Sequence, residues 1–308
     1  MKTIYNISIL ALALAALCSC RKADNPVSSE LQEMTFEVSA SNSFDTKTVL
    51  VGSSPEGVGV VFITANDKFG IFPVGVDTQP YLFNVKSVSF NPEDPVNIGG
   101  FCKSASRYFA LCPYNENARY VRSSSGYGDY IQTDLPSSQT LPSYAENTYD
   151  PLAGISMAEG YNGAFTLKNV CSAIRVSFGD AVPVSRLVLT NEVEYGEFLA
   201  GNKIRFHTSG YVDTGYTTEK SHSVELFPFK TMIRKGGEVY FIVLPGKYSN
   251  LKLEVYDENN TLKWTRVCTS SVTFEPSKIY AFPEIDVDVT YMDFFGMDQF
   301  TNTYYLWD

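Results

Sequence analysis

The chain has few of the residues from which catalytic and metal sites are most often built. It contains two histidines among 308 residues, and neither His207 nor His222 lies in an H-x-E or H-E-x-x-H pattern. The G-x-S-x-G elbow, the Walker loop and the G-x-G-x-x-G turn are absent as well. We therefore predict no catalytic residue, no metal site, no cofactor and no enzymatic activity. His207 falls on the polar side of an alternating run and is expected to be solvated.

Two acidic arrangements leave alternatives open. Asp286 and Asp288 project to the same side of an alternating run, which fits either a solvated face or the beginning of a calcium site. The chain has 34 acidic residues, and a carboxylate pair for glycoside hydrolysis is defined by a distance in space that a sequence does not contain. No local pattern favours either chemistry.

Positive charge and cysteine are scarce too. Lys and Arg number 24 against 34 Asp and Glu, and the net charge of −10 disfavours nucleic acid or an anionic membrane surface as a partner. Cysteine occurs six times, without CxxC or zinc-ligand spacing. Cys112 and Cys171 lie within strand-like runs, so we expect small buried hydrophobic residues there. The disulfide state is open for Cys102, Cys112, Cys171 and Cys268.

Long apolar runs are confined to the beginning of the chain. Lys2 precedes an apolar run over residues 7–17, which leads into a Leu-Cys-Ser-Cys ending at Cys20. This pattern predicts a secretory signal over residues 1–19, too short to span a bilayer. The ending resembles a bacterial lipobox, in which Cys20 becomes the first residue and carries acyl chains such as palmitate. A plain signal peptide with two incidental cysteines is the alternative.

The rest of the chain has the pattern of short β-strands. Apolar and polar residues alternate with period two in residues 34–38, 174–178, 204–207, 251–256 and 285–291, and helical periodicity is absent. Residues 239–244 are apolar at both odd and even positions, which predicts a central strand that is buried on both faces. Residues 257–260, Asp-Glu-Asn-Asn, predict a hairpin turn. Together these patterns predict an all-β fold of antiparallel sandwiches.

We divide the chain into four parts. They are a lipoprotein signal peptide (1–19), a polar tether (20–33), an N-terminal β-sandwich domain (34–180) and a C-terminal β-sandwich domain (181–308). The boundary is placed at a turn-like Asp-Ala-Val-Pro segment between two strand signals. Residues 120–151 are rich in Ser, Gly, Tyr and Pro, and are expected to form a long excursion that is ordered only in parts.

A series of short segments follows along the chain in a distinctive order. They are Thr46-Lys47-Thr48, Ala65-Asn66-Asp67-Lys68-Phe69-Gly70-Ile71-Phe72, residues 108–115, Leu135-Pro136 with Gln139, Asp150-Pro151-Leu152-Ala153, residues 163–176, Leu199-Ala200-Gly201, Val243-Leu244-Pro245-Gly246 and Lys278-Ile279-Tyr280. Taken together with the lipobox, they resemble the fimbrillin family of surface lipoproteins and type V pilus subunits. The chain departs from the family at Cys112, where an aromatic residue is usual, and at Leu167, where the family often has His.

The resemblance implies two tandem transthyretin-like β-sandwiches. It also implies a surface-exposed lipoprotein of the outer membrane. In the pilins that the chain resembles, a protease cuts after a basic residue and frees an N-terminal strand, and a C-terminal strand of the next subunit fills the groove. Here Lys47 is the first basic residue after Lys22, so a cut at Lys47 would free the strand of residues 34–38.

The last residues are unusually aromatic for the end of a chain. One interpretation is a final strand packed on its own domain. The other is a donor segment, residues 285–308, which inserts into another subunit by β-augmentation. The residues predicted to enter the groove are Ile285, Val287, Val289, Tyr291, Phe294 and Phe295.

We therefore expect a structural or adhesive subunit of pilus assembly or cell adhesion. Its partners would be other pilus subunits, or host or glycan surface ligands, and the stalk, tip, anchor and stand-alone roles are all open. The rival is a glycan-binding surface lipoprotein of a carbohydrate-uptake system, in which tyrosines of residues 120–150 stack on sugars. Ordered stacking aromatics would favour the rival, and a detachable strand would favour the pilin.

Overall fold

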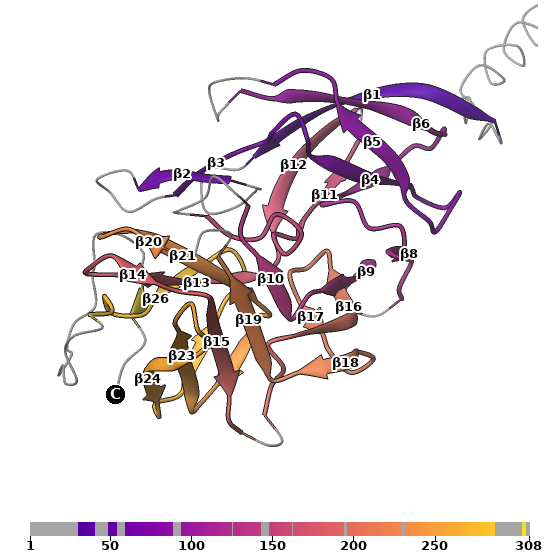
Figure 1. Cartoon of the computed structure of the whole chain (residues 1–308). Helices are drawn as coiled ribbons and strands as arrows, with labels where there is room; N and C mark the ends of the chain where they lie inside the picture. Colours follow the sequence, from indigo (N-terminus) through magenta and orange to yellow (C-terminus); the bar gives the residue numbers. More distant parts are fainter. Residues whose placement is uncertain are drawn as a thin grey trace, which may run out of the picture.

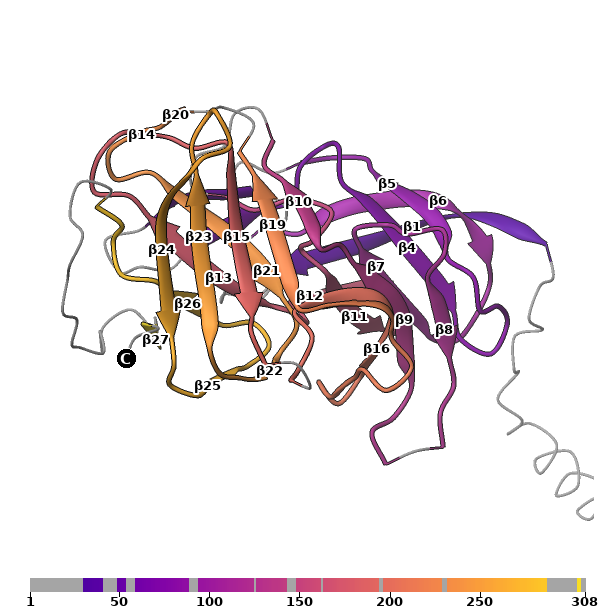
Figure 2. The same cartoon turned by 60° about the horizontal axis from the view of Figure 1, so that its bottom comes forward.

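A computed structural model describes residues 30–40, 49–53, 59–88, 94–124, 126–142, 148–161, 163–193, 196–228, 232–286 and 304–305 (Figure 1). Every regular element in these ranges is a β-strand, which confirms the all-β class. In the same ranges there is no helix long and apolar enough to cross a membrane. The N-terminal strands gather on one side of the molecule and the C-terminal strands on the other (Figures 1 and 2).

The N-terminal strands form a closed barrel. In order around it are β1 (Leu31–Ala40), β12 (Ala164–Asn169), β11 (Ser156–Gly160), β7 (Tyr108–Cys112), β4 (Lys68–Pro73), β5 (Tyr81–Val85) and β6 (Val96–Lys103). Alternate side chains fill its interior, among them Phe69, Ile71, Phe83 and Phe165. The closure differs from the sandwich expected for this half, because β1 pairs on both edges and joins the two ends of the sheet.

Most C-terminal strands form two sheets that share a second core. One sheet contains, in order, β10 (Ser138–Thr140), β19 (Ser223–Phe227), β15 (Arg186–Asn191), β23 (Leu251–Tyr256) and β24 (Leu262–Cys268). The other contains β21 (Glu238–Val243), β13 (Ser172–Ser177), β26 (Ile279–Ala281) and β27 (Tyr304–Tyr305). Leu187 and Leu253 of the first sheet and Ile174 and Phe241 of the second belong to this core. Figure 2 shows β19, β15, β23 and β24 side by side.

Smaller sheets complete the described part of the chain. One consists of β17 (Val212–Asp213), β16 (Ala200–His207), β9 (Tyr130–Leu135) and β8 (Arg119–Val121), with β18 (Thr218–Ser221) also pairing with β16. The two-stranded pairs are β2 (Val49–Ser53) with β3 (Gly59–Phe62), β14 (Val182–Pro183) with β20 (Met232–Ile233), and β22 (Gly246–Tyr248) with β25 (Val272–Phe274). In the sheet around β16, β9 pairs antiparallel with β16.

Strand pairing crosses the predicted domain limits. β1 begins at Leu31, within the predicted tether. β13 precedes residue 180 yet pairs with β21 and β26, and β9 and β10 pair with β16 and β19. The expected excursion of residues 120–151 therefore supplies strands to C-terminal sheets. That residues 34–180 and residues 181–308 each fold independently stays a prediction.

The predicted hairpin turn at residues 257–260 is confirmed. β23 and β24 pair antiparallel on either side of it. The Asp257 Oδ1 atom accepts hydrogen bonds of 2.9 Å from the backbone N–H groups of Asn259 and Thr261. An Asp side chain that caps its own turn in this way explains why this sequence ends one strand and begins the next.

The cysteines of the described chain are buried, and no disulfide bond joins them. They are Cys102, Cys112, Cys171 and Cys268. This confirms the expectation that Cys112 and Cys171 act as small buried hydrophobic residues. Burial raises the pKa of the Cys102 thiol to about 12 and raises the pKa of the Cys171 thiol as well, so both stay protonated at neutral pH.

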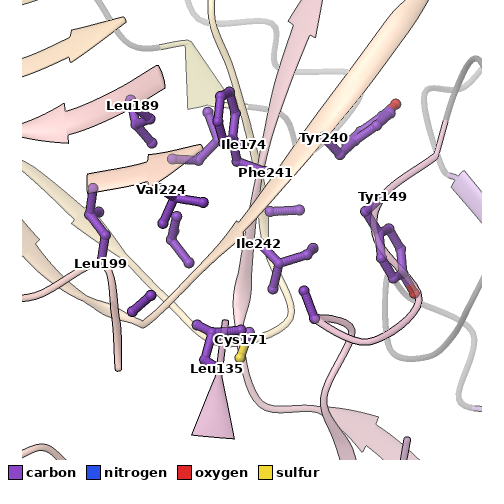
Figure 3. Packing of buried hydrophobic residues seen from close by; sticks show 14 of the residues in the cluster. Leu135, Tyr149, Cys171, Ile174, Leu189, Leu199, Val224, Tyr240, Phe241 and Ile242 are labelled. Atoms are coloured by element: carbon purple, nitrogen blue, oxygen red, sulfur yellow. The ribbon is translucent and has the colours of Figure 1, made fainter. Parts of the chain in front are cut away.

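β21 is buried on both faces, as predicted from its apolar residues at both odd and even positions. In Figure 3, Phe241 lies on the side of Val224, whereas Tyr240 and Ile242 lie on the side of Tyr149. The strand is not central in its sheet, however, because β13 is its one neighbouring strand in the described sheet order.

The other edge of β21 is hydrogen-bonded by the side chain of Gln139. Gln139 is fully buried, its Nε2 donates to the Ile242 carbonyl oxygen at 2.6 Å, and its Oε1 accepts from the Ile242 N–H at 3.0 Å. The Thr148 carbonyl oxygen accepts from the Tyr240 N–H at 3.2 Å on the same edge. The Gln139 amide thus makes the two hydrogen bonds that a neighbouring strand would make.

We expect Gln139→Leu to lower the free energy of unfolding by about 2–4 kcal/mol, because it leaves the buried N–H and C=O of Ile242 without these partners. Urea denaturation measures the change. Gln79→Leu makes the same replacement at an exposed position and should shift stability by less than about 0.5 kcal/mol. Equal stability of the two variants would contradict the role assigned to Gln139.

Candidate functional site

β1 closes the barrel through its main chain on both edges. The antiparallel edge joins residues 31–38 of β1 to residues 96–103 of β6. The parallel edge joins residues 37–40 to residues 164–167 of β12. Without β1, the facing backbone groups of β6 and β12 would lose their hydrogen-bond partners, and the barrel would have two open edges.

The inner face of β1 is packed against aromatic rings. Phe36 is 3% exposed, Val38 is fully buried and Met34 is partly buried against the same core, whereas the alternate residues Glu33, Thr35 and Glu37 are exposed. The Phe36 ring centroid lies 5.0 Å from that of Tyr108, 5.3 Å from that of Phe165 and 5.4 Å from that of Phe83. This confirms the alternation predicted for the strand.

β1 therefore occupies a slot with the properties of a strand-binding site. Its two walls are backbone edges, which bind any extended segment through main-chain hydrogen bonds. Its floor consists of aromatic rings, which bind alternate apolar side chains. We call this feature the β1 slot, meaning the edges of β6 and β12 together with Phe83, Tyr108 and Phe165.

Most site residues predicted from the sequence lie outside the described residues. They are Cys20, Lys47, Val287, Val289, Tyr291, Phe294 and Phe295. Ile285 is described, and it is fully buried in the C-terminal core. Its N–H donates to the Ser177 carbonyl oxygen at 2.8 Å, and its own carbonyl oxygen accepts from the Gly179 N–H at 2.9 Å. Ile285 is thus held by its own chain, and a donor strand would have to begin after it.

Residues 304–305 form a strand that pairs with another strand of the same chain. β27 pairs in parallel with β26, with Tyr304 opposite Tyr280 and Tyr305 opposite Ala281. This pairing extends the sheet of β21, β13 and β26 by one strand. This is the arrangement expected if the C-terminal residues form a final strand packed on their own domain.

We expect Phe36→Ala to lower the free energy of unfolding by about 3–5 kcal/mol, because it leaves a cavity among three buried rings. Glu37→Ala, at the neighbouring exposed position, should change it by less than about 0.5 kcal/mol. Denaturant unfolding of both variants tests this. Similar losses in both would contradict the assignment of the inner face.

A second feature is a cavity of about 370 Å³ between the barrel and the sheet around β16. Its walls come from β11 and β12, from the end of β16 and the turn that follows, and from residues 276–277. Phe109, Met157, Phe206 and Val212 supply apolar surface. The volume and the mixed lining are those of small-molecule sites.

Two buried polar side chains line this cavity and have unused hydrogen-bonding capacity. The Asn169 Oδ1 atom accepts from the Cys171 N–H at 2.8 Å, while its Nδ2 has no partner. The His207 Nδ1 atom lies 3.0 Å from the Gly128 carbonyl oxygen, which can only accept, so Nδ1 bears the hydrogen. In the neutral ring Nε2 is then an acceptor, and it has no partner.

The expectation that His207 is solvated is wrong. It is 5% exposed, although it follows the buried Phe206 in β16 and should have the opposite parity. The rings of Tyr127, Tyr130 and Tyr211 cover it, with centroids 5.9, 5.0 and 5.6 Å from that of His207. These tyrosines lie outside β16. The alternation of residues within β16 therefore could not predict that they cover His207.

Tyr127 and Tyr211 form an exposed aromatic pair beside the cavity. Their rings stack with centroids 4.1 Å apart and an interplanar angle of 22°, and they are 51% and 45% exposed. Tyr211 also lines the cavity. Tyr127 belongs to the tyrosine-rich segment noted in the sequence, whereas no sequence signal marks Tyr211 as its neighbour.

Arg107 ties the barrel to the segment before β9 at one side of the cavity. Its guanidinium lies 2.8 Å from Asp129 and 3.0 Å from Glu159, which lines the cavity. Burial disfavours ionised Asp129, but hydrogen bonds from the Ser123 N–H, Tyr120 and Arg107 outweigh it and lower the Asp129 pKa. Burial and the bond to Asp129 raise the pKa of Tyr120 to about 12. Asp129 is therefore ionised and the Tyr120 hydroxyl is protonated at neutral pH.

The chain has weak structural similarity to a few solved proteins. No family model matches the sequence, and no curated protein matches it. Among solved structures, the C-terminally truncated tip fimbrial protein Mfa3 from Porphyromonas gingivalis is similar at 7% identity and a TM-score of 0.31, over 77% of this chain and 81% of that chain. A candidate cell adhesion protein from Bacteroides eggerthii is similar at 12% identity and a TM-score of 0.32, over 81% and 85%.

Proposed function

We propose that the chain is a subunit of a surface structure of the fimbrillin type, with a structural or adhesive role in pilus assembly or cell adhesion. One observation carries the proposal. β1, the first described strand, completes the barrel through main-chain pairing along both edges. A strand that is held in this way is suited to replacement by an extended segment of another subunit.

The proposed exchange begins with a cut between β1 and β2. β1 ends at Ala40, β2 begins at Val49, and Lys47 lies between them. Cleavage after Lys47 would remove the covalent link that keeps β1 next to its slot. The empty slot would expose three aromatic rings and two unpaired backbone edges, which favours an incoming strand.

The proposed occupant is the C-terminal segment of a neighbouring subunit. Because Ile285 is held in its own body, the donor residues are those that follow it. Val287, Val289 and Tyr291 alternate with polar residues and can fill the floor of the slot, and Phe294 and Phe295 add aromatic side chains. An uncut anchor or tip subunit is the alternative role.

The finer parts of the proposal rest on the sequence. They are export, lipidation at Cys20, a surface position on the outer membrane and the absence of enzymatic activity. The charged start, short apolar run and Cys20 of the first twenty residues support export and lipidation. Several acyl chains on one residue give a stable anchor.

Cys20→Ser should abolish labelling by a fatty-acid probe and release the protein from membranes, because the acylated residue is lost. Metabolic labelling and membrane fractionation measure both effects. Cys18→Ser, two residues away, is the matched control and should behave like the natural protein. Labelling that persists in Cys20→Ser would contradict the lipidation site.

Deletion of residues 292–308 should leave a folded monomer that is no longer incorporated into filaments, because part of the donor strand is missing. Electron microscopy of cell-surface filaments and circular dichroism of the purified chain measure the two properties. Deletion of residues 304–308 removes β27 but leaves Phe294 and Phe295, and it should preserve incorporation. A polymerising 292–308 deletion would exclude the donor role, and an unfolded one would assign the tail to its own body.

A second candidate function is glycan binding at the cell surface. The stacked, exposed pair of Tyr127 and Tyr211 favours it, because an aromatic ring beside a cavity offers an apolar face to a sugar. This function does not require strand exchange. The two functions are compatible in an adhesive subunit.

A further inference from the structure

Buried polar atoms in folded proteins almost always have a hydrogen-bond partner, and exceptions call for an explanation. Two exceptions, Asn169 Nδ2 and His207 Nε2, belong to residues that line the same cavity. We propose that this cavity binds one sugar unit of a carbohydrate, whose hydroxyl groups supply the missing partners. The proposal rests on glycan binding, the second candidate function above, and deepens it by naming the cavity and the side chains that would hold the sugar; it is independent of strand exchange at the β1 slot.

The hydrogen-bonding groups match a hydroxyl-bearing ligand. Asn169 cannot turn its amide without losing the bond from the Cys171 N–H to Oδ1, so Nδ2 remains a donor. The ring of His207 is fixed in the same manner by Gly128, and in its neutral form Nε2 is an acceptor. A hydroxyl group both donates and accepts, so a ring with several hydroxyl groups can satisfy both side chains.

The charges around the cavity favour an uncharged ligand. The charged lining residues are Glu159 and Lys168, and both are exposed. Glu159 already accepts hydrogen bonds from Arg107 at 3.0 Å and from the Tyr161 hydroxyl at 2.7 Å. A phosphate-bearing ligand would also meet a chain with a net charge of −10. These features disfavour nucleotides and other anions.

The apolar surface matches the carbon face of a sugar ring. Tyr211 lines the cavity and is held in place by stacking on Tyr127 at 4.1 Å. Met157, Phe206 and Val212 contribute further apolar surface. Sites for small molecules commonly combine such surface with a few oriented polar groups. The volume of about 370 Å³ lies near the lower end of the range for such sites, so it suits a single sugar unit.

Ligand-observed NMR titration of the purified protein tests the proposal. The saccharide probes are glucose, galactose, N-acetylglucosamine, maltose and lactose, and the non-saccharide probes are adenosine and indole. We expect at least one saccharide to bind with a dissociation constant on the order of 1 mM, and more tightly than either non-saccharide. Circular dichroism of each variant reports that the fold is intact.

Three variants assign the binding to the cavity. Tyr211→Ala removes the aromatic wall and should weaken binding roughly tenfold. Thr208→Trp places a bulky ring at an exposed lining position and should abolish binding by blocking the cavity. Tyr216→Ala is the matched control, because Tyr216 is 62% exposed and is not part of the lining, and its binding should be unchanged.

Several results would overturn the proposal. They are no binding of any saccharide, unchanged binding in both Tyr211→Ala and Thr208→Trp, equal weakening in Tyr216→Ala, and tighter binding of adenosine or indole than of every saccharide. Filament incorporation of these variants is a separate readout, and it tests the assembly proposal without bearing on the sugar site.

Discussion

The structure depends on a wall of three strands, β4, β7 and β11, that is buried on both faces. In β7 the side chains alternate between two cores: Tyr108, Ala110 and Cys112 point into the barrel, and Phe109 and Leu111 point into the C-terminal core. β4 and β11 contribute to both cores in the same way. A backbone that separates two apolar interiors must have all its polar groups paired, and neighbouring strands provide that pairing. Both halves of the molecule therefore rely on one surface, and neither core is closed without it.

The position of β1 follows from this wall. Around the barrel, β12 and β11 separate β1 from β7 on one side, and β6, β5 and β4 separate them on the other. β1 thus lies across the barrel from the shared wall and contributes side chains to the barrel core alone. Loss of β1 would open one core and leave the wall and the second core covered. A strand that is to be exchanged has to lie at such a place, because its removal must not unfold the rest of the subunit.

Local patterns in the sequence predict the strands well and their neighbours poorly. The alternation around Phe36, the double-sided burial of residues 239–244 and the turn at Asp257 each depend on contiguous residues, and each was predictable. Barrel closure was not, because Ser39 Oγ reaches the Phe165 carbonyl oxygen across 126 residues of chain. Gln139 illustrates the same limit, since nothing near it in the sequence indicates that its amide replaces a strand. The cavity also escaped prediction, because its lining comes from segments that are brought together only by folding.

β12 connects the two proposed binding features. Its residues Phe165 and Leu167 are buried in the barrel core beside β1, while Thr166 and Lys168, from the same strand, line the cavity. Its edge supplies the parallel hydrogen bonds to β1. Any small shift of β12 that accompanies sugar binding would therefore also change the fit of the strand in the β1 slot. Thermodynamic linkage makes such an effect reciprocal: a sugar that favours one occupant of the slot must bind more tightly when that occupant is in place. An adhesive subunit built in this way would have a ligand affinity that depends on its state of assembly.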